Sequence, residues 1–97
     1  MSEASLVKKI IDRLTREVGG LWIKISAGPF QVAGLPDIIG CYKGRFFGIE
    51  VKLPGKERTL TKLQQWWIDR INTTGQGKAT MVTSVEQAIK FVKNFQD

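Results

Sequence analysis

The first third of the chain changes from a helical to a strand-like spacing of hydrophobic residues. Between Glu3 and Val18 apolar residues recur every three or four positions, which predicts a helix with one buried face. Ser2 is placed to cap the start of this helix, and Gly19-Gly20 to end it. Alternation of apolar and polar residues then predicts a strand from Leu21 to Ser26, and the glycines and proline of residues 27–34 predict a loop.

The remaining two thirds predict a hairpin, two more helices and a fourth strand. The elements expected are strands at about Asp37–Tyr42 and Arg45–Leu53, a helix from Thr61 to about Thr73, a short buried strand at Ala79–Thr83 and a last helix after Ser84. The order α-β-β-β-α-β-α predicts an α/β fold, in which helices pack against a central mixed sheet.

The two later helices each carry an apolar side. The expected buried positions are Leu60, Leu63, Trp66, Trp67 and Ile71 in the first, and Val85, Ala88, Ile89, Val92 and Phe95 in the second, where Gln87 holds the capping-box position after Ser84. Trp66 and Trp67 are adjacent, so both cannot point into the core. An exposed tryptophan can stack on a nucleic-acid base or bury in a dimer interface, and the interface is favoured.

Two carboxylates and a lysine interrupt the apolar strands of the predicted hairpin. In a two-residue turn at Lys43-Gly44, Tyr42 pairs with Arg45, and the same register places Asp37 opposite Glu50 with their Cβ atoms ~5 Å apart. Lys52 lies two residues after Glu50 and so shares its face of the strand. The three side chains are therefore expected to converge on one spot.

Facing carboxylates in an apolar sheet repel each other, and burial raises the pKa of at least one of them. A divalent cation removes this repulsion; Mg²⁺ binds one or two carboxylates together with water and phosphate oxygens, and the backbone carbonyl of Val51 offers a further ligand. A neighbouring lysine would contact the remaining anion, so Asp37, Glu50 and Lys52 fit metal-assisted phosphodiester hydrolysis. The alternative is that Asp37 merely starts a strand and that Glu50 and Lys52 form a surface ion pair.

The composition narrows the possible chemistry. The 97 residues suffice for one domain, and a net charge of +6 favours a polyanionic partner such as nucleic acid. The absence of histidine excludes Ser-His, Cys-His and His-ligated zinc sites. One cysteine, Cys41, permits no internal disulfide and is interpreted as a small core residue, which suits a reducing compartment. The amphipathic, acid-bearing N-terminus is not typical of a secretory signal, and no run approaches the ~18 apolar residues of a membrane span.

The sequences "LPD" at Leu35–Asp37 and "EVK" at Glu50–Lys52 resemble the PD-(D/E)XK nuclease signature. With Glu3 in the first helix and "LTKLQ" ending at Gln64, the whole chain resembles a minimal stand-alone domain, residues 1–97, of the VRR-NUC branch. The resemblance implies a restriction-endonuclease-like core and Mg²⁺- or Mn²⁺-dependent DNA cleavage. It also implies a cytoplasmic protein of a bacterium or a phage-infected cell.

The resemblance also implies a role for each matched residue. Asp37 and Glu50 would bind the metal, Lys52 would be the catalytic lysine, Glu3 would lie near the metal, through water if not directly, and Gln64 would orient Lys52 or a water. Two of these residues have structural alternatives. An acid in the first turn is favoured by the helix dipole, and Gln64 completes a capping box with Thr61.

Small stand-alone relatives resemble junction-resolving homodimers, so a structure-selective DNA endonuclease, a Holliday junction resolvase, is the function expected. A flap, nicking or restriction-type nuclease and a non-catalytic DNA-binding module are the alternatives. Basic residues around the hairpin are expected to hold DNA phosphates, and no membrane partner is expected. These residues are Lys24, Lys56, Arg58 and Lys62.

Overall fold

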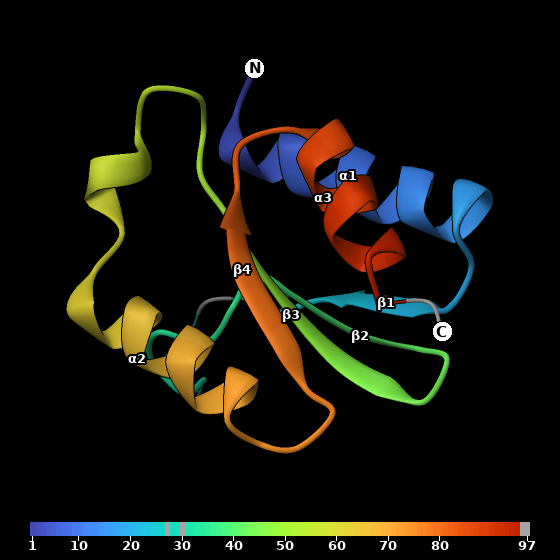
Figure 1. Ribbon diagram of the computed structural model, residues 1–97. Helices are drawn as coiled ribbons and strands as arrows, with labels where there is room; N and C mark the ends of the chain where they lie inside the picture. Colours follow the sequence, from blue (N-terminus) through green and yellow to red (C-terminus); the bar gives the residue numbers. More distant parts are fainter. Residues whose placement is uncertain (27, 30, 96–97) are drawn as a thin grey trace.

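In the computed structural model, which describes residues 1–26, 28–29 and 31–95, the helices and strands follow the predicted order. The elements are α1 (Glu3–Glu17), β1 (Leu21–Lys24), β2 (Ile38–Tyr42), β3 (Arg45–Val51), α2 (Lys62–Asn72), β4 (Lys78–Val82) and α3 (Val85–Lys93). A short 3₁₀ helix, η1 (Glu57–Thr59), lies on the segment that arches from β3 to α2 in Figure 1.

The four strands form one mixed sheet in the order β1-β2-β3-β4. The first two pairs are antiparallel and β3 runs parallel to β4. Helices α1 and α3 pack on one face of the sheet, and α2 packs on the other, against β3 and β4 (Figure 1). This arrangement confirms the α/β class and the mixed sheet flanked by helices.

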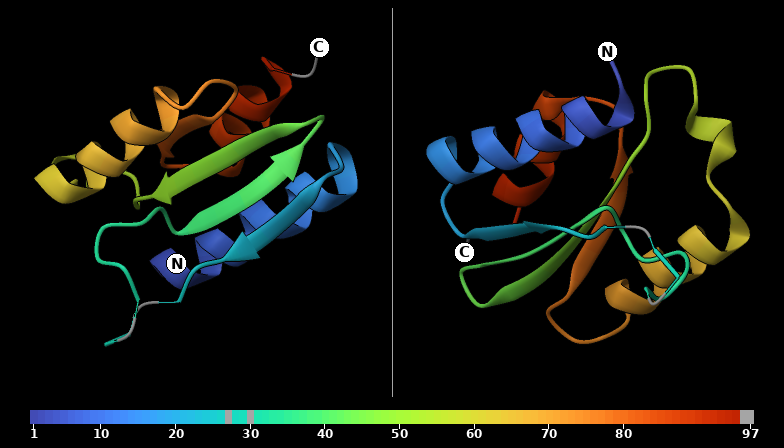
Figure 2. Two further views of the ribbon diagram at one scale, coloured as in Figure 1. Left: turned by 90° about the horizontal axis from the view of Figure 1, so that it is seen from below. Right: turned by 180° about the vertical axis from the view of Figure 1, so that it is seen from behind.

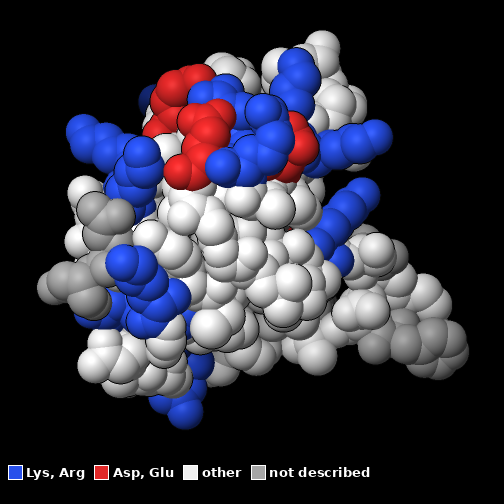
Figure 3. Space-filling view, turned by 90° about the vertical axis from the view of Figure 1, so that its right-hand side faces the viewer, with Lys and Arg blue, Asp and Glu red and all other residues white. Residues whose placement is uncertain are grey.

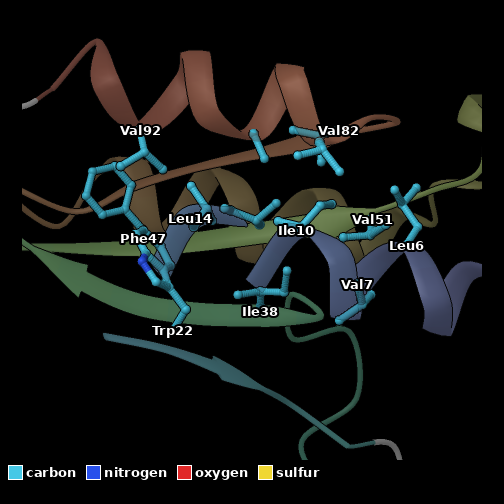
Figure 4. Close-up of a cluster of buried hydrophobic side chains, with 13 residues drawn as sticks. Leu6, Val7, Ile10, Leu14, Trp22, Ile38, Phe47, Val51, Val82 and Val92 are labelled. Carbon is cyan, nitrogen blue, oxygen red and sulfur yellow. The ribbon is translucent and has the colours of Figure 1, made fainter. Parts of the chain in front are cut away.

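The main core lies between the sheet and the α1–α3 layer. Figure 4 shows apolar side chains from both layers meeting there, among them Trp22 and Phe47 from the sheet and Leu14 and Val92 from the helices. Ile10, Leu14, Ile38, Phe47 and Val92 have no exposed surface. The buried face of α1 is therefore the one that the helical spacing of its apolar residues predicts. A smaller cluster under α2 is formed by Ile68, Ile71 and Ala79.

Each helix begins at the residue that the sequence indicates. The Ser2 side chain accepts from the Ser5 N–H, and those of Thr61 and Ser84 accept from the N–H groups of Gln64 and Gln87. The predicted reciprocal bond of the last helix is wrong, however, because Gln87 Oε1 accepts instead from the N–H of Thr83, at 2.7 Å. No helix in the described ranges is long and apolar enough to cross a membrane.

The strands are shorter than predicted at the end of the sheet that carries the acids. β1 ends at Lys24 rather than residue 26, β2 begins after Asp37, and β3 ends at Val51 rather than residue 53. Residues 27 and 30 of the predicted loop lie outside the described residues. Two of the predicted site residues, Asp37 and Lys52, therefore lie just outside the strands. The start of the loop before β2 lies at the same end of the sheet, where the backbone hydrogen bonds between strands are incomplete.

Two predictions about burial are wrong. Leu63 is 45% exposed, and Ile68 lies with Ile71 on the buried side of α2. Trp66 is 52% exposed and Trp67 is partly buried, which confirms that the adjacent pair does not point into the core together. Cys41 is exposed rather than part of the core. Its strand alternates, and Cys41 lies on the face opposite the α1–α3 layer, where α2 does not reach β2.

Candidate functional site

The β2–β3 hairpin has the predicted register. Tyr42 pairs with Arg45 and Ile38 with Ile49, so the next pair along the same ladder is Asp37 and Glu50. The turn residues Lys43 and Gly44 have φ values of 51° and 79°, as a type I′ turn requires. A local turn preference thus places the two acids side by side.

Asp37 is held on both sides by backbone hydrogen bonds. Its Oδ2 accepts from the Val51 N–H at 2.8 Å, in the position that a strand carbonyl would occupy. Its own carbonyl oxygen accepts from the Ile25 N–H at 2.8 Å. The carboxylate therefore has one oxygen committed to the fold and a fixed backbone position.

Glu50 is an acid in an environment that disfavours its charge. It is 2% exposed, and its Oε1 has no hydrogen-bond partner among the described residues. Burial raises the pKa of Glu50 from an ordinary 4.5 to about 9, with a hydrogen bond to Asp37 and repulsion by its charge as the next causes. Lys52 lowers this pKa and Glu3 raises it slightly further. A proton shared with Asp37 or a bound cation would relieve the buried charge.

Lys52 is 8% exposed and follows directly on β3, where its N–H donates to the Val82 carbonyl at 3.0 Å. The parallel ladder to β4 thus fixes its backbone. Lys52 makes no ion pair with a described acid, although its charge acts on Glu50. The alternative of a surface ion pair is therefore excluded, and the ammonium of a largely buried lysine remains for an incoming anion.

Gln64 closes the predicted capping box and in addition lies near Glu50, whereas its expected role toward Lys52 or a water stays a prediction. Its Oε1 accepts from the Thr61 N–H at 2.9 Å, which closes the capping box of α2. Its Nε2 makes a long contact of 3.5 Å with Oε2 of Glu50. Because the Gln64 side-chain oxygen is used by the cap, the group that faces the Glu50 carboxylate is the NH₂ of Gln64, which is a hydrogen-bond donor.

A cavity of about 630 Å³ opens beside these side chains. Its wall includes Glu3, Lys24, Asp37 and Gln64, with residues of the loop before β2. The exposed residues Lys56, Arg58 and Lys62 do not line it; Lys56 directly precedes η1, Arg58 lies in η1, and Lys62 is the first residue of α2. Four of the predicted site residues therefore line this cavity, and the expected contact of the basic residues with DNA stays a prediction.

The donor set fits a divalent cation that completes its shell with other ligands. Within the described ranges no group of three or more acids, cysteines or histidines could hold a metal by itself, so Glu3 does not form a triad with Asp37 and Glu50. Two carboxylates with one unsatisfied buried oxygen match the small protein contribution that Mg²⁺ takes. The Val51 carbonyl points to the same side of β3 as its N–H, toward Asp37.

Two supports of the site were missed by the sequence analysis. The indole N–H of Trp67 donates to the Ala33 carbonyl at 3.1 Å, which ties the loop before Asp37 to α2. Gly34 has a φ of 84°, and a Cβ there would lie 2.5 Å from Cγ of Leu63. The glycine in "GLPD" was the available signal, because positive φ and close approach both favour glycine.

Neither a protein-family model nor a curated protein matches the chain. The case for a function therefore depends on the geometry of the site and on the resemblance of its motifs.

Proposed function

We propose that this protein is a metal-dependent, structure-selective DNA endonuclease of the VRR-NUC type, acting as a homodimeric junction resolvase. The observation that carries the proposal is the convergence of Asp37, buried Glu50 and buried Lys52 at one end of the sheet. Burying two ionisable groups beside a third that is partly buried costs free energy, and such sites are concentrated where a ligand or reaction uses them.

The architecture supports the same proposal. A restriction-endonuclease-like core of the order α-β-β-β-α-β-α places its acids on the second and third strands, and this chain has that order with a mixed sheet. Fold alone does not determine function, so the weight lies on the acids and the lysine.

Each residue has a task in phosphodiester hydrolysis. Asp37 and Glu50, with the Val51 carbonyl, would hold the cation, which when bound supplies Lewis-acid polarisation of the phosphate. Lys52 holds its ammonium where it can stabilise the negative charge that grows on the phosphate oxygens. Gln64 restrains Glu50 from the α2 side, and Glu3 extends the acidic wall of the cavity.

DNA would approach with its phosphates toward the basic residues around the site. Lys24 lines the cavity on one side, and Lys56, Arg58 and Lys62 flank the site from η1 and α2. None of the four forms an ion pair with a described acid, so their charge is available for phosphate.

The test is to incubate labelled four-way junction, flap and linear duplex with the protein in Mg²⁺, Mn²⁺ or EDTA. We expect paired cuts in the junction with either metal and none in EDTA. Cutting of flap or duplex instead would make the protein a flap, nicking or restriction-type nuclease. Binding of DNA without cutting in any metal would leave a non-catalytic DNA-binding module and overturn the proposed activity.

A further inference from the structure

The face of the sheet opposite α1 and α3 carries an open apolar surface. Strand alternation and register place two cross-strand rows there, Leu21–Cys41–Phe46 and Ile23–Ile39–Gly48. Leu21, Ile23 and Phe46 are 63%, 47% and 45% exposed. We call the surface formed by Leu21, Ile23, Ile39, Cys41 and Phe46 the open sheet face.

The fold itself leaves this surface uncovered. Helix α2 packs mainly on β4 and β3, and its Ile71 lies over Gly48, where an added Cβ would be 2.9 Å from Cδ1 of Ile71. Seen from below in the left view of Figure 2, β1, β2 and much of β3 face the viewer with no helix across them. No helix among the described residues covers the open sheet face, although its composition is that of a buried face.

The size of the surface suits the centre of a protein interface. At roughly 150–250 Å² for a large side chain, its three most exposed residues leave on the order of 300 Å² of apolar surface open. A stable interface takes about 800 Å² from each partner, so the open sheet face would form an apolar centre within a polar rim.

The absence of charged residues on this surface indicates which kind of partner it binds. None of its residues is charged, so it offers no cation to the phosphates of a nucleic acid or to an acidic peptide. Two copies of a chain with net charge +6 repel each other, and a charge-free face is where they can approach at least cost. A flat apolar sheet is also complementary to itself, as a two-fold contact requires.

We propose that the open sheet face binds a second copy of this chain in a two-fold, face-to-face dimer. The inference rests on the proposed function in one respect, because paired cuts are what call for two sites. Glu50 follows Phe46 and Gly48 on the same face of β3, about 13 Å along the strand from Phe46. Each site of the dimer would thus lie beside the interface.

The exposed surface around Trp66 on α2 is a weaker interface, although the sequence favours Trp66 for that role. Its helical neighbours three and four residues away include Lys62, Asp69 and Arg70, all exposed. A two-fold contact there would take these charged groups of both copies out of water, which costs free energy. Trp66 therefore provides a matched control for the open sheet face.

The experiment measures oligomeric state and Cys41 reactivity in wild-type protein and in Leu21→Asp, Phe46→Asp and Trp66→Asp variants. Light scattering should find wild type and Trp66→Asp as dimers and the other two as monomers with unchanged circular dichroism. Cys41 is the single cysteine, so its labelling by a maleimide needs no further substitution. It should react about tenfold more slowly in the dimers than in the monomeric variants.

A wild-type monomer would overturn the proposal, and so would a dimer in which Cys41 reacts as fast as in unfolded protein. Dissociation by Trp66→Asp but not by Leu21→Asp or Phe46→Asp would move the interface to α2. Failure of the nuclease is separable, since a protected dimer that cuts no DNA would retain this interface and lose the proposed activity.

Discussion

At the scale of single residues, a substitution of Lys52 tests the proposed phosphodiester hydrolysis most directly. It is 8% exposed and unpaired with any described acid, so its ammonium is available for phosphate. Lys52→Ala should lower the rate of junction cleavage about 100–1000-fold, because it removes one preorganised positive group from the transition state. Binding measured in EDTA should change little. Lys90→Ala on α3, an exposed lysine, should cleave normally; cleavage retained in Lys52→Ala would remove Lys52 from the mechanism.

The raised pKa of Glu50 predicts how the stability of the protein depends on pH in the absence of metal. Its folded pKa of about 9 lies above the ordinary 4.5, so between these values the folded chain binds more protons than the unfolded chain. The free energy of unfolding should therefore fall as pH rises through this window, by at most about 1.4 kcal/mol per pH unit for one proton.

Glu50→Gln should flatten that dependence, because an amide does not titrate. The comparison is urea unfolding with EDTA at about pH 5.5 and about pH 8, within the window between the two pKa values. Wild type should lose more stability than the variant between the two conditions. Parallel changes in both proteins would mean that Glu50 is ionised in the folded state at neutral pH.

At the scale of elements, local chemistry explains what the sequence could predict. The register of β2 and β3 follows from a two-residue turn in which Lys43 and Gly44 both take positive φ. The helices begin at Ser2, Thr61 and Ser84 because a side-chain oxygen there accepts a free N–H. The meeting of Asp37 and Glu50 was predictable because it depends on that register alone.

What the sequence could not predict depends on contacts between distant elements. Cys41 and Leu63 were assigned to buried positions because apolar residues in periodic segments usually face a core. Whether a face is covered is decided by where α2 packs, and among the described residues it packs mainly on β4 and β3. The link from Trp67 to Ala33 is equally non-local, joining residues 34 positions apart.

The contribution to stability of the contact between α2 and the loop before β2 can be measured with substitutions at two glycines. Gly34 and Gly55 have φ values of 84° and 86°, so alanine at either costs about 1–2 kcal/mol of backbone strain. A Cβ at Gly34 would also lie 2.5 Å from Leu63 and 3.1 Å from Trp67, whereas Gly55 has nothing within 4 Å. In urea unfolding, Gly34→Ala should lose roughly 1–3 kcal/mol more stability than Gly55→Ala. Equal losses would show that α2 does not hold the loop.

At the scale of the whole molecule, positive charge is neutralised on one side and left free on another. On α1, Arg16 pairs with Asp12 at 2.8 Å, and Arg13 pairs with Glu17. In Figure 3 the acidic side chains in view are gathered at the top among basic ones, while further basic side chains lie lower down at the sides. The basic residues around the site have no such partners, so an approaching polyanion is drawn toward the site.

The salt dependence of DNA binding tests that distribution. In EDTA, binding to a four-way junction should weaken as salt rises, because each phosphate contact releases a counterion. Lys56→Gln, Arg58→Gln and Lys62→Gln should each lower the slope of log K against log salt by about one. Lys90→Gln and Lys93→Gln, which remove equal charge from exposed positions on α3, should leave the slope unchanged. If the α3 variants lowered the slope as much as the others, net charge alone would drive binding, and the segment between β3 and α2 would have no particular part in holding DNA.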